Sequence, residues 1–401
     1  MSSAHLEVAD IFLKHGQLWR QKHEGHFSLG QLKVMSAIER CRTMALGGHK
    51  LRCPRCSHIE IAYNSCRNRH CPKCQATASH RWLEARQADL LPVEYFHVVF
   101  TVPSQVSELA YQNKSVIYGI LFKAVTQTLS IIAGDKKHLG AKIGATLVLH
   151  TWGSAMMHHP HIHCIIPGGG LTSDSKQWVK CKAGYFLPVE VLSLLFKRLF
   201  LDMLYQAYLK KKLKFYNAMK KIESENQFFY WIKPLKKKDW VVYAKKPFAG
   251  PEAVLAYLAR YTHRVAIANS RLISLKQGKV TFKYKEYRKK EGKQEEEMTL
   301  KAAEFMRRFL IHVLPSGFHR IRHIGLFANA RRRKNLESIR TLLRPQVKSK
   351  VPAQIIEIKL EPIKIKQAVT SKKITYHCKK CGEAMDIIDT FKRIIYSRAP
   401  P

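Results

Sequence analysis

Apolar positions change their spacing along the chain, and each kind of spacing predicts a different element. Residues 1–40 carry apolar side chains three and four positions apart, which predicts amphipathic helices. The segment EYFHVVFTVP alternates instead, with His97 and Thr101 on the same face, and therefore predicts a strand. The apolar pattern that follows predicts one long helix from about Ser104 to Ala133.

Two further strands are predicted in GATLVLHTW and HIHCIIP, which a short loop connects. A connection this short predicts that the two strands are antiparallel neighbours. Further along, GPEAVLAYLARYTHR predicts a helix and RLISLKQGKVTFKYKEY predicts a hairpin with Gly278 in its turn. The expected fold class is α+β, with a central antiparallel sheet, packed helices and a small N-terminal module rich in cysteine.

The charge balance narrows the class of partner. The 401 residues include 70 Lys and Arg against 29 Asp and Glu, a formal net charge of +41. An excess this large predicts a polyanionic partner, and nucleic acid is the first expectation. A membrane surface is the alternative, but no apolar run approaches the roughly 18 residues of a membrane span. Because the N-terminus lacks the continuous apolar core of a secretory signal, we expect a soluble, cytoplasmic protein.

A cysteine-rich segment predicts a zinc module. CPRC and HCPKC each contain a CxxC pair, and fourteen residues separate the two pairs. Such pairs make tight turns that point both sulfurs at one ion, and four thiolates complete a tetrahedron without an open position. We predict one structural Zn²⁺ site with the ligands Cys53, Cys56, Cys71 and Cys74. A second site is an open alternative for the remaining ligands of the region, Cys41, His49, Cys66 and His70.

A third CxxC pair, Cys378 and Cys381, lies near the C-terminus. Alone it supplies half a zinc site, which His377 or another cysteine cluster would complete. The other interpretation is a turn that faces solvent.

The histidines of MMHHPHIHCIIPGGG predict a second kind of metal site. On a strand, His161 and His163 project from the same face. A lone histidine usually packs or faces solvent, but this pair runs into an apolar segment, where charged histidines need partners. We predict His150, on the neighbouring strand, as the third ligand. His159 competes for that role, but Pro160 is expected to break the strand and leave His159 in the loop.

Three neutral imidazoles suit zinc. In so basic a chain, the second interpretation is that these histidines hold an ion that acts as a Lewis acid on a phosphodiester. Mg²⁺ or Mn²⁺ are hard cations suited to phosphate oxygens, so either is the expected catalytic ion.

A pair of tyrosines supplies candidate nucleophiles. Tyr257 and Tyr261 are four residues apart and therefore share one face of the predicted helix. Arg260 and Arg264 lie beside them and are predicted to hold DNA backbone. Tyrosines at this spacing usually only pack against neighbouring side chains. The combination with the histidines makes the nucleophile interpretation the stronger one here.

The strand with two histidines, followed by a helix with Tyr-x-x-x-Tyr, resembles the HUH endonucleases. The resemblance is closer to the rolling-circle insertion-sequence transposases of the insertion sequence ninety-one family and its common-region relatives. It covers roughly residues 40–340. The segments that carry it are ALGGHKLRCPRCSHIEIAYNSCRNRHCPKCQ, HVVFTVP, LHTWGSAMMHHPHIHCIIPGGGL, YLARYTHRVAIANSRL and GFHRIRHIGLFANARRRKNL.

The resemblance implies an enzyme that cuts and rejoins single-stranded DNA. A tyrosine attacks the phosphodiester, forms a 5′-phosphotyrosine link and frees a 3′-OH. By position, His161 and His163 take the metal-binding role, and Tyr257 and Tyr261 take the nucleophile role. Some relatives use one tyrosine, so the need for both stays open, and the resemblance does not settle the third metal ligand.

A basic segment near residue 330 predicts DNA contacts. It interleaves cationic side chains with Phe318 and Phe327, a combination typical of single-strand binding, although a solvated face is the ordinary alternative. The predicted DNA-binding residues there are Arg320, Arg322, Arg331, Arg332 and Arg333.

Together these features predict four regions and one leading function. The regions are N-terminal helices (1–40), a zinc-binding domain (41–90), an HUH tyrosine transposase domain (91–340) and a basic C-terminal tail with a CxxC pair (341–401). The expected partner is DNA, as single strands or hairpin element ends. Two alternatives stay open: a replication initiator or relaxase of the same chemistry, and a zinc-stabilised nucleic-acid-binding protein without catalysis.

Overall fold

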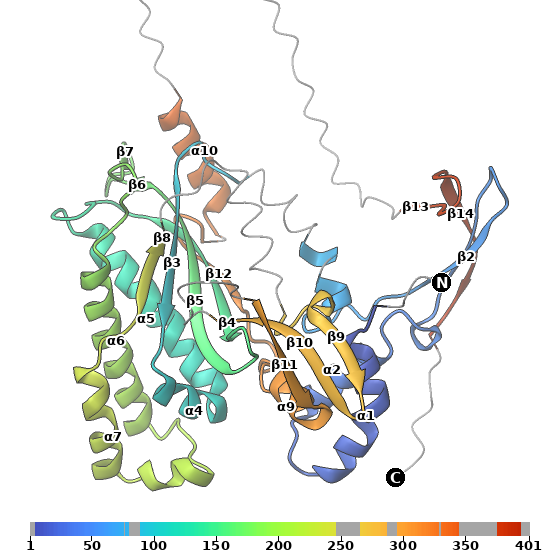
Figure 1. Ribbon diagram of the computed structural model, residues 1–401. Coiled ribbons are helices and arrows are strands. Elements are labelled where there is room, and N and C mark those ends of the chain that lie inside the picture. Colours follow the sequence, from blue (N-terminus) through green and yellow to red (C-terminus); the bar gives the residue numbers. More distant parts are fainter. Residues whose placement is uncertain are drawn as a thin grey trace, which may run out of the picture. The chain divides into compact units, whose positions relative to one another are not determined.

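The computed structural model describes residues 5–75, 77–79, 89–245, 265–286, 295–328, 330–344 and 375–393 (Figure 1). The chain forms two compact units. The larger unit contains Met1–Cys41 and Cys66–Leu343, and the smaller unit contains Arg42–Ser65 and Arg344–Pro401.

A five-stranded sheet forms the centre of the larger unit. Its order is β12 (Ile321–Gly325), β4 (Gly144–Trp152), β5 (His158–Pro167), β3 (Tyr95–Thr101) and β8 (Val242–Lys245). Every neighbouring pair is antiparallel. This confirms the predicted central antiparallel sheet and the pairing of its two histidine-bearing strands.

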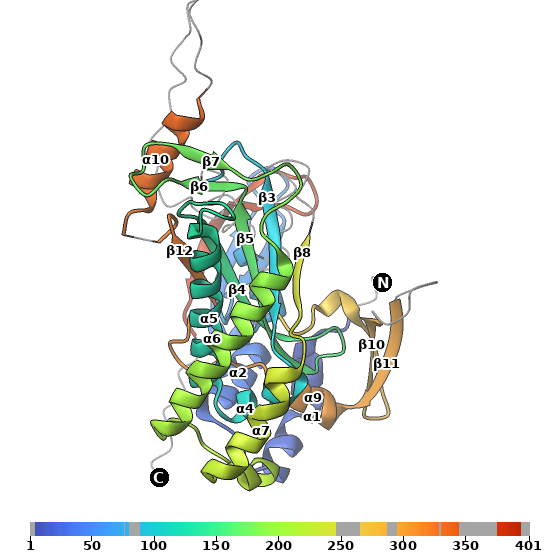
Figure 2. The ribbon, with the colours of Figure 1, turned by 90° about the vertical axis from the view of Figure 1, so that its left-hand side faces the viewer.

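Helices cover one face of this sheet. Alternate residues of its central strands, among them Phe100 and Ile162, point into one large apolar cluster. Figure 2 shows α5 and α6 running along the sheet. The helices that contribute to this cluster are α4 (Ser104–Gln112), α5 (Lys114–Gly134), α6 (Val189–Leu209) and α7 (Glu225–Lys237).

The single helix predicted from Ser104 to Ala133 is two helices in the structure. The chain breaks at Asn113, which has φ −124° and ψ 41°. The Asn113 side chain donates to the Leu109 carbonyl at 3.1 Å and to the Lys214 carbonyl at 2.8 Å. Asparagine competes with the helix for backbone partners in this way, which apolar periodicity does not reveal.

A second sheet of the larger unit packs with the N-terminal helices. It consists of β9 (Leu272–Lys276), β10 (Lys279–Lys285) and β11 (Glu295–Lys301). The predicted hairpin is confirmed, and Gly278 in its turn has φ +70°. The helices packed in the same apolar cluster are α1 (Val8–Lys22), α2 (Leu29–Glu39) and α9 (Ala302–Leu310). Shorter elements are β6 (Gly169–Leu171), β7 (Trp178–Lys180), α10 (Arg332–Leu343) and the 3-10 turns at Asn217–Ile222 and Asn269–Arg271.

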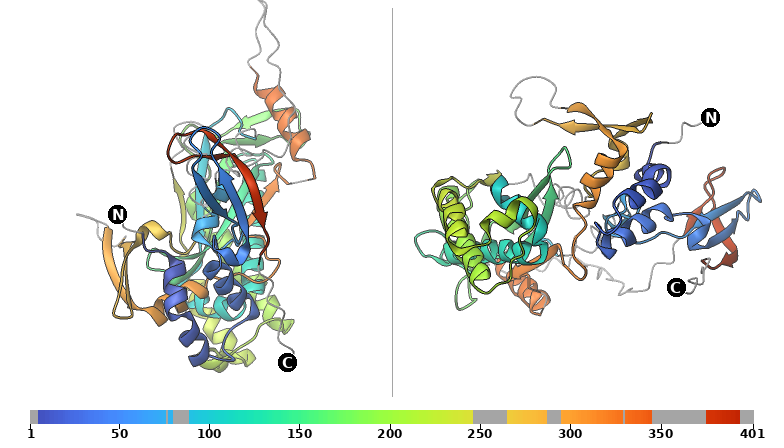
Figure 3. Two further views of the ribbon diagram at one scale, coloured as in Figure 1. Left: turned by 90° about the vertical axis from the view of Figure 1, so that its right-hand side faces the viewer. Right: turned by 90° about the horizontal axis from the view of Figure 1, so that it is seen from below.

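The smaller unit joins segments from the two ends of the chain. Its sheet has the order β13 (Tyr376–His377), β14 (Ala384–Phe391), β1 (Gly48–Arg52) and β2 (Ile59–Tyr63), after a 3-10 turn at Met44–Leu46. Figure 3 shows β14 beside β1, and the two pair in antiparallel register. Residues that were predicted as a zinc-binding domain and as a C-terminal tail therefore share one sheet.

Among the residues that the structure describes, one helix is apolar enough to cross a membrane by length and composition alone. It is α5, whose most apolar stretch of 18 residues has a mean hydropathy of 1.6. Of this stretch, 56% is buried inside the structure. The expectation that no segment approaches the length of a span was therefore too strict. Buried residues of α5, such as Leu121 and Phe122, belong to the core against the central sheet.

Candidate metal centres

The structure brings together the three histidines predicted to hold a catalytic ion. His150 on β4 pairs with His161 on β5, and His163 lies two residues further along the same face. One ligand atom of each lies within 4.8 Å of those of the other two. The rings of His150 and His163 are 4.4 Å apart, and those of His161 and His163 are 4.8 Å apart. The intervening Ile162 belongs to the core on the opposite face of the sheet.

His159, the competing third ligand, is outside this cluster. The expectation that Pro160 ends the strand is wrong, because β5 begins at His158. The register slips between His150 and Trp152, so β5 carries an extra residue opposite Thr151. A bulge of this kind is one of the few positions in a sheet that tolerates a proline, since a residue there is unpaired.

His158 is half-buried on β5 and lies outside the cluster. Its Nε2 lies 2.7 Å from the Tyr118 hydroxyl, and its Nδ1 lies 2.9 Å from the Ser107 carbonyl. Burial lowers the pKa of His158 to about 4, with a smaller effect from the charge of Lys114. His158 is therefore a neutral structural residue, held apart from the cluster.

Neighbouring groups fix the orientation of the three clustered rings. His161 Nδ1 lies 2.7 Å from the His159 carbonyl, and His163 Nδ1 lies 2.8 Å from His97 Nε2. Trp152 stacks on His150 with ring centroids 4.9 Å apart. Because Nδ1 is engaged in two of the three rings, Nε2 is the atom that each of these two can offer to an ion. Three such imidazoles fit a divalent transition ion.

His97 is a functional candidate that the sequence reasoning placed on the correct strand face but did not assign to the site. Its ring is nearly parallel to that of His163, at an interplanar angle of 6°. If His163 binds an ion through Nε2, its Nδ1 carries the proton and donates it to His97 Nε2. Partners of this kind orient metal-binding histidines and raise their basicity.

We expect His97→Leu to lower the apparent affinity for Mn²⁺ by about 10- to 100-fold, because His163 loses its acceptor. His97→Gln keeps an acceptor oxygen and should restore part of that affinity. The measurement is a calorimetric titration of each purified variant with Mn²⁺. Equal Mn²⁺ affinities in the leucine variant and the wild type would show that His97 does not position His163.

The larger unit also holds a cluster of four cysteines. Cys74 Sγ lies 3.6 Å from Cys41 Sγ and 3.5 Å from Cys66 Sγ, and Cys71 completes the group. The thiols interact closely: the neighbouring thiols, Cys41 first, lower the pKa of Cys74 and raise the pKa of Cys66 and of Cys71. Four sulfurs at these separations fit a closed structural zinc site.

The smaller unit holds a second cluster of four cysteines. Cys53 Sγ lies 3.4 Å from Cys381 Sγ, and Cys56 Sγ lies 3.5 Å from Cys378 Sγ. The C-terminal CxxC pair is thus completed by another cluster, one of the two interpretations left open. The antiparallel pairing of β1 with β14 brings the two CxxC turns together.

These two groups correct the predicted ligand set. The structure does not bring Cys53, Cys56, Cys71 and Cys74 into one site, because each CxxC pair is completed by different cysteines. His70 is not a ligand in either group. It is buried, its pKa is lowered to about 3 by that burial, and the Leu314 N–H approaches its Nε2 at 3.5 Å.

We expect the purified chain to hold two zinc ions, one in each cysteine group. Cys41→Ser and Cys378→Ser should each lower the count to about one, and the double variant should lower it to about zero. Metal analysis per chain after mild dialysis measures this, with Cys181→Ser, outside both groups, as the control. A wild-type count of one, or an unchanged count in Cys378→Ser, contradicts the second site.

The predicted DNA-binding arginines divide by burial. The prediction that Arg320 contacts DNA is wrong, because this side chain is buried and its guanidinium donates to Gln75 Oε1 at 2.8 Å. Burial lowers its pKa to about 10. Arg322 stacks over Phe122 at 4.1 Å, and Arg332 forms an ion pair with Asp89 at 2.6 Å.

Arg331 and Arg333 keep exposed side chains that DNA can reach. The remaining predicted residues, Tyr257, Arg260, Tyr261 and Arg264, lie outside the residues that the structure describes.

Comparison with known proteins adds two family matches. Residues 144–335 match the Y2_Tnp model, described as "Putative transposase". Residues 11–102 match the Zn_Tnp_IS91 model, described as "Transposase zinc-binding domain". The first match contains the histidine cluster, and the second contains the cysteine group of the larger unit.

Two curated proteins are similar over most of their length. "Putative transposase y4qJ" of Sinorhizobium fredii (strain NBRC 101917 / NGR234) is 53% identical over 337 residues, which is 84% of each chain. "Transposase for insertion sequence element IS801" of Pseudomonas savastanoi pv. phaseolicola is 26% identical over 302 residues, 75% of this chain and 70% of that protein. No solved structure matches.

Proposed function

Because this chain belongs to the transposase family that joins an IS91-type zinc-binding domain to a Y2 transposase domain, we propose that it nicks and rejoins single-stranded DNA through a 5′-phosphotyrosine link. The observation that supports this most is the cluster of His150, His161 and His163 on the sheet face opposite the helical core. We assign catalysis to residues 91–340. We expect the protein to act on DNA in the cytoplasm of a bacterium, at its nucleoid.

In the proposed reaction, the phenol oxygen of Tyr257 or Tyr261 attacks a phosphorus of the strand. The bond to the 3′ oxygen breaks, the phenol proton passes to solvent or to a base, and the 3′ oxygen takes up a proton. Rejoining reverses these steps with another 3′-OH as the nucleophile. The energy of the phosphodiester is kept in the phosphotyrosine, so no nucleoside triphosphate is needed.

The histidines would hold Mg²⁺ or Mn²⁺, which supplies positive charge to the phosphate under attack. His97 and the His159 carbonyl keep the rings of His163 and His161 in one orientation. Such preorganisation matters because an ion displaced by about 1 Å can cost 100-fold in rate. The cysteine groups take no part in this chemistry and stabilise the fold around their zinc ions.

Excess positive charge brings the strand to the site. Contacts from Lys and Arg to phosphates give most of the affinity, and this affinity falls steeply with salt. Among the described members of the predicted set, Arg331 and Arg333 are exposed and can make such contacts.

The test is a nicking assay on end-labelled single-stranded oligonucleotides that carry the ends of the element. We expect a nick with Mn²⁺, none with chelator, and a protein–DNA adduct that survives denaturation. Binding without a nick would favour the alternative of a non-catalytic nucleic-acid-binding protein. A transposase and an initiator or relaxase of the same chemistry differ in the DNA that they cut. A nick confined to the ends of the element therefore favours the transposase.

A further inference from the structure

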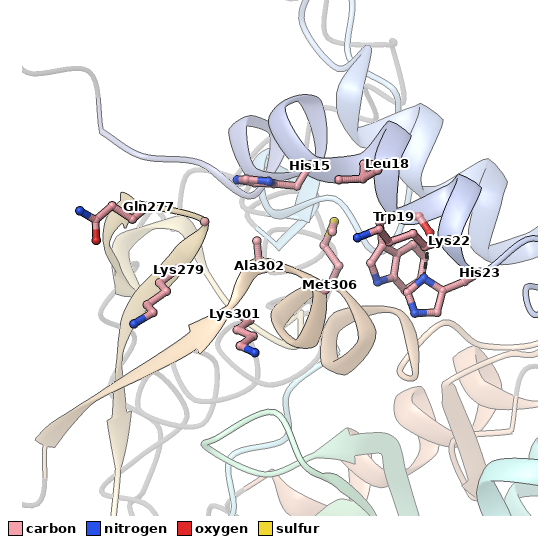
Figure 4. A pocket seen from close by; sticks show the side chains of 12 residues that line it. His15, Leu18, Trp19, Lys22, His23, Gln277, Lys279, Lys301, Ala302 and Met306 are labelled. Atoms are coloured by element: carbon pink, nitrogen blue, oxygen red, sulfur yellow. Dashed lines mark hydrogen bonds between the residues drawn. The ribbon is translucent and has the colours of Figure 1, made fainter.

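A pocket outside the histidine cluster lies in the larger unit between α1, the β9–β10 turn and the start of α9 (Figure 4). Its volume of about 310 Å³ is at the lower end of the range typical of small-ligand sites. Figure 4 shows His15, Leu18 and Trp19 on α1, across from Ala302 and Met306 on α9. The pocket is therefore built on regular elements.

Two of the residues that line this pocket have a buried side-chain nitrogen without a partner. Among the residues that the structure describes, neither Trp19 Nε1 nor His15 Nε2 makes a hydrogen bond. Trp19 is only 6% exposed, and its ring is held by stacking on Phe27 at 4.5 Å and on His23 at 4.8 Å. A buried indole N–H usually has an acceptor, so this edge of the pocket is prepared for a ligand that accepts a hydrogen bond.

The rim of the pocket is positively charged. Lys22, Lys279 and Lys301 line it, and its lining contains no carboxylate. Within the described part of the chain, none of these lysines forms an ion pair. Helix α9 begins at Ala302, so the positive end of its dipole also lies at the pocket. This combination favours an anionic ligand.

We infer that the pocket binds one unpaired nucleotide of the single-stranded DNA substrate. The base enters between Leu18 and Met306 and accepts from the indole N–H of Trp19, and its phosphate lies at the lysine rim. An isolated phosphate would leave the apolar interior unfilled, and an apolar peptide would leave the lysines unpaired. The inference rests on the proposed function, because it assigns one contact of the strand that the enzyme cuts.

The pocket has a physical connection to the metal site. Trp19 belongs to the same apolar cluster as Trp152, and Trp152 stacks on His150. Well-packed clusters are close to rigid, so a nucleotide held at Trp19 keeps a fixed position relative to the histidines. The pocket thereby sets which phosphodiester of a bound strand reaches the ion.

The first experiment locates the nucleotide. Full-length protein is irradiated with oligonucleotides that carry 5-iododeoxyuridine at one position each, and the cross-linked peptides are sequenced. We expect one position, at a constant distance from the nick, to cross-link to Trp19, His23 or Met306. Cross-links that all map outside the pocket would overturn the inference, even if the protein nicks normally.

The second experiment measures affinity and salt dependence. Trp19→Phe keeps the aromatic stack and removes the N–H, and Lys279→Gln with Lys301→Gln removes rim charge. We expect about a tenfold weaker oligonucleotide affinity in each, and a salt slope smaller by about one per lost phosphate contact in the lysine variant. The control, Lys137→Gln with Lys176→Gln, removes the same charge from exposed positions outside the pocket.

The outcomes separate this inference from the proposed function. Normal nicking with unchanged affinity in Trp19→Phe and in the lysine variant overturns the pocket alone. A protein that neither binds nor nicks single strands overturns both. Thymidine monophosphate is the remaining probe: if it binds as tightly as the strand, the pocket takes a free nucleotide and the assignment to DNA is wrong.

Discussion

Replacing His161 and His163 together by alanine is expected to lower the metal-dependent nicking rate by about a thousand-fold or more. The variant loses two of the three ligands and therefore the ion whose positive charge offsets that of the phosphate. Losing this charge raises the activation free energy by several kcal/mol. Affinity for single-stranded DNA should stay within about threefold, because it comes mostly from Lys and Arg. Single-turnover nicking rates and fluorescence anisotropy with a labelled oligonucleotide measure the two quantities.

The control is His138→Ala, an exposed histidine outside the cluster, which should nick like the wild type. His150→Ala tests the third ligand separately and should nick as slowly as the double variant at low Mn²⁺. Both variants should keep the fold, because the three rings lie on the face opposite the main core. Wild-type nicking in the double variant would remove the metal site from the mechanism.

The histidine site could be predicted from sequence because its geometry is local. A strand periodicity of two puts His161 and His163 on one face, and a short loop makes β4 its antiparallel neighbour. Together these bring His150 within reach. His97 was harder to assign, because the pairing of β3 with β5 spans more than sixty residues. The signal was its place on the same face of the strand as Val99, which pairs with His163.

The cysteine groups show where such reasoning stops. Spacing identifies a CxxC pair as half of a zinc site but does not say which other pair completes it. Here the partner of Cys53 and Cys56 comes from more than 300 residues away, through the pairing of β1 with β14. The same limit explains Arg320. A basic run reads as a solvent-facing surface, and only tertiary packing shows that this member is buried against Gln75.

Replacing Tyr257 and Tyr261 together by phenylalanine is expected to abolish the denaturation-resistant protein–DNA adduct. A phenol with a pKa near 10 is a poor nucleophile at neutral pH, so only a tyrosine that reaches the ion-bound phosphate can react. On the helix predicted from the sequence, residues four apart share one face, so both can serve one site. One could then cut while the other holds the first end, and the single variants should therefore differ in strand joining. Adduct yield on a denaturing gel and peptide mapping measure these effects.

Tyr243 provides the matched control for this assignment. It is 53% exposed on β8, and it pairs with Val99, whose other neighbour is His163. Residues in such register point to the same side of a sheet, so Tyr243 is a described tyrosine on the metal-binding face. Tyr243→Phe should leave the adduct intact and change DNA affinity by less than about threefold, as for one lost contact. If the adduct instead maps to Tyr243 and persists in Tyr257→Phe/Tyr261→Phe, the nucleophile belongs to the sheet, and the tyrosine helix would then serve only to bind the strand.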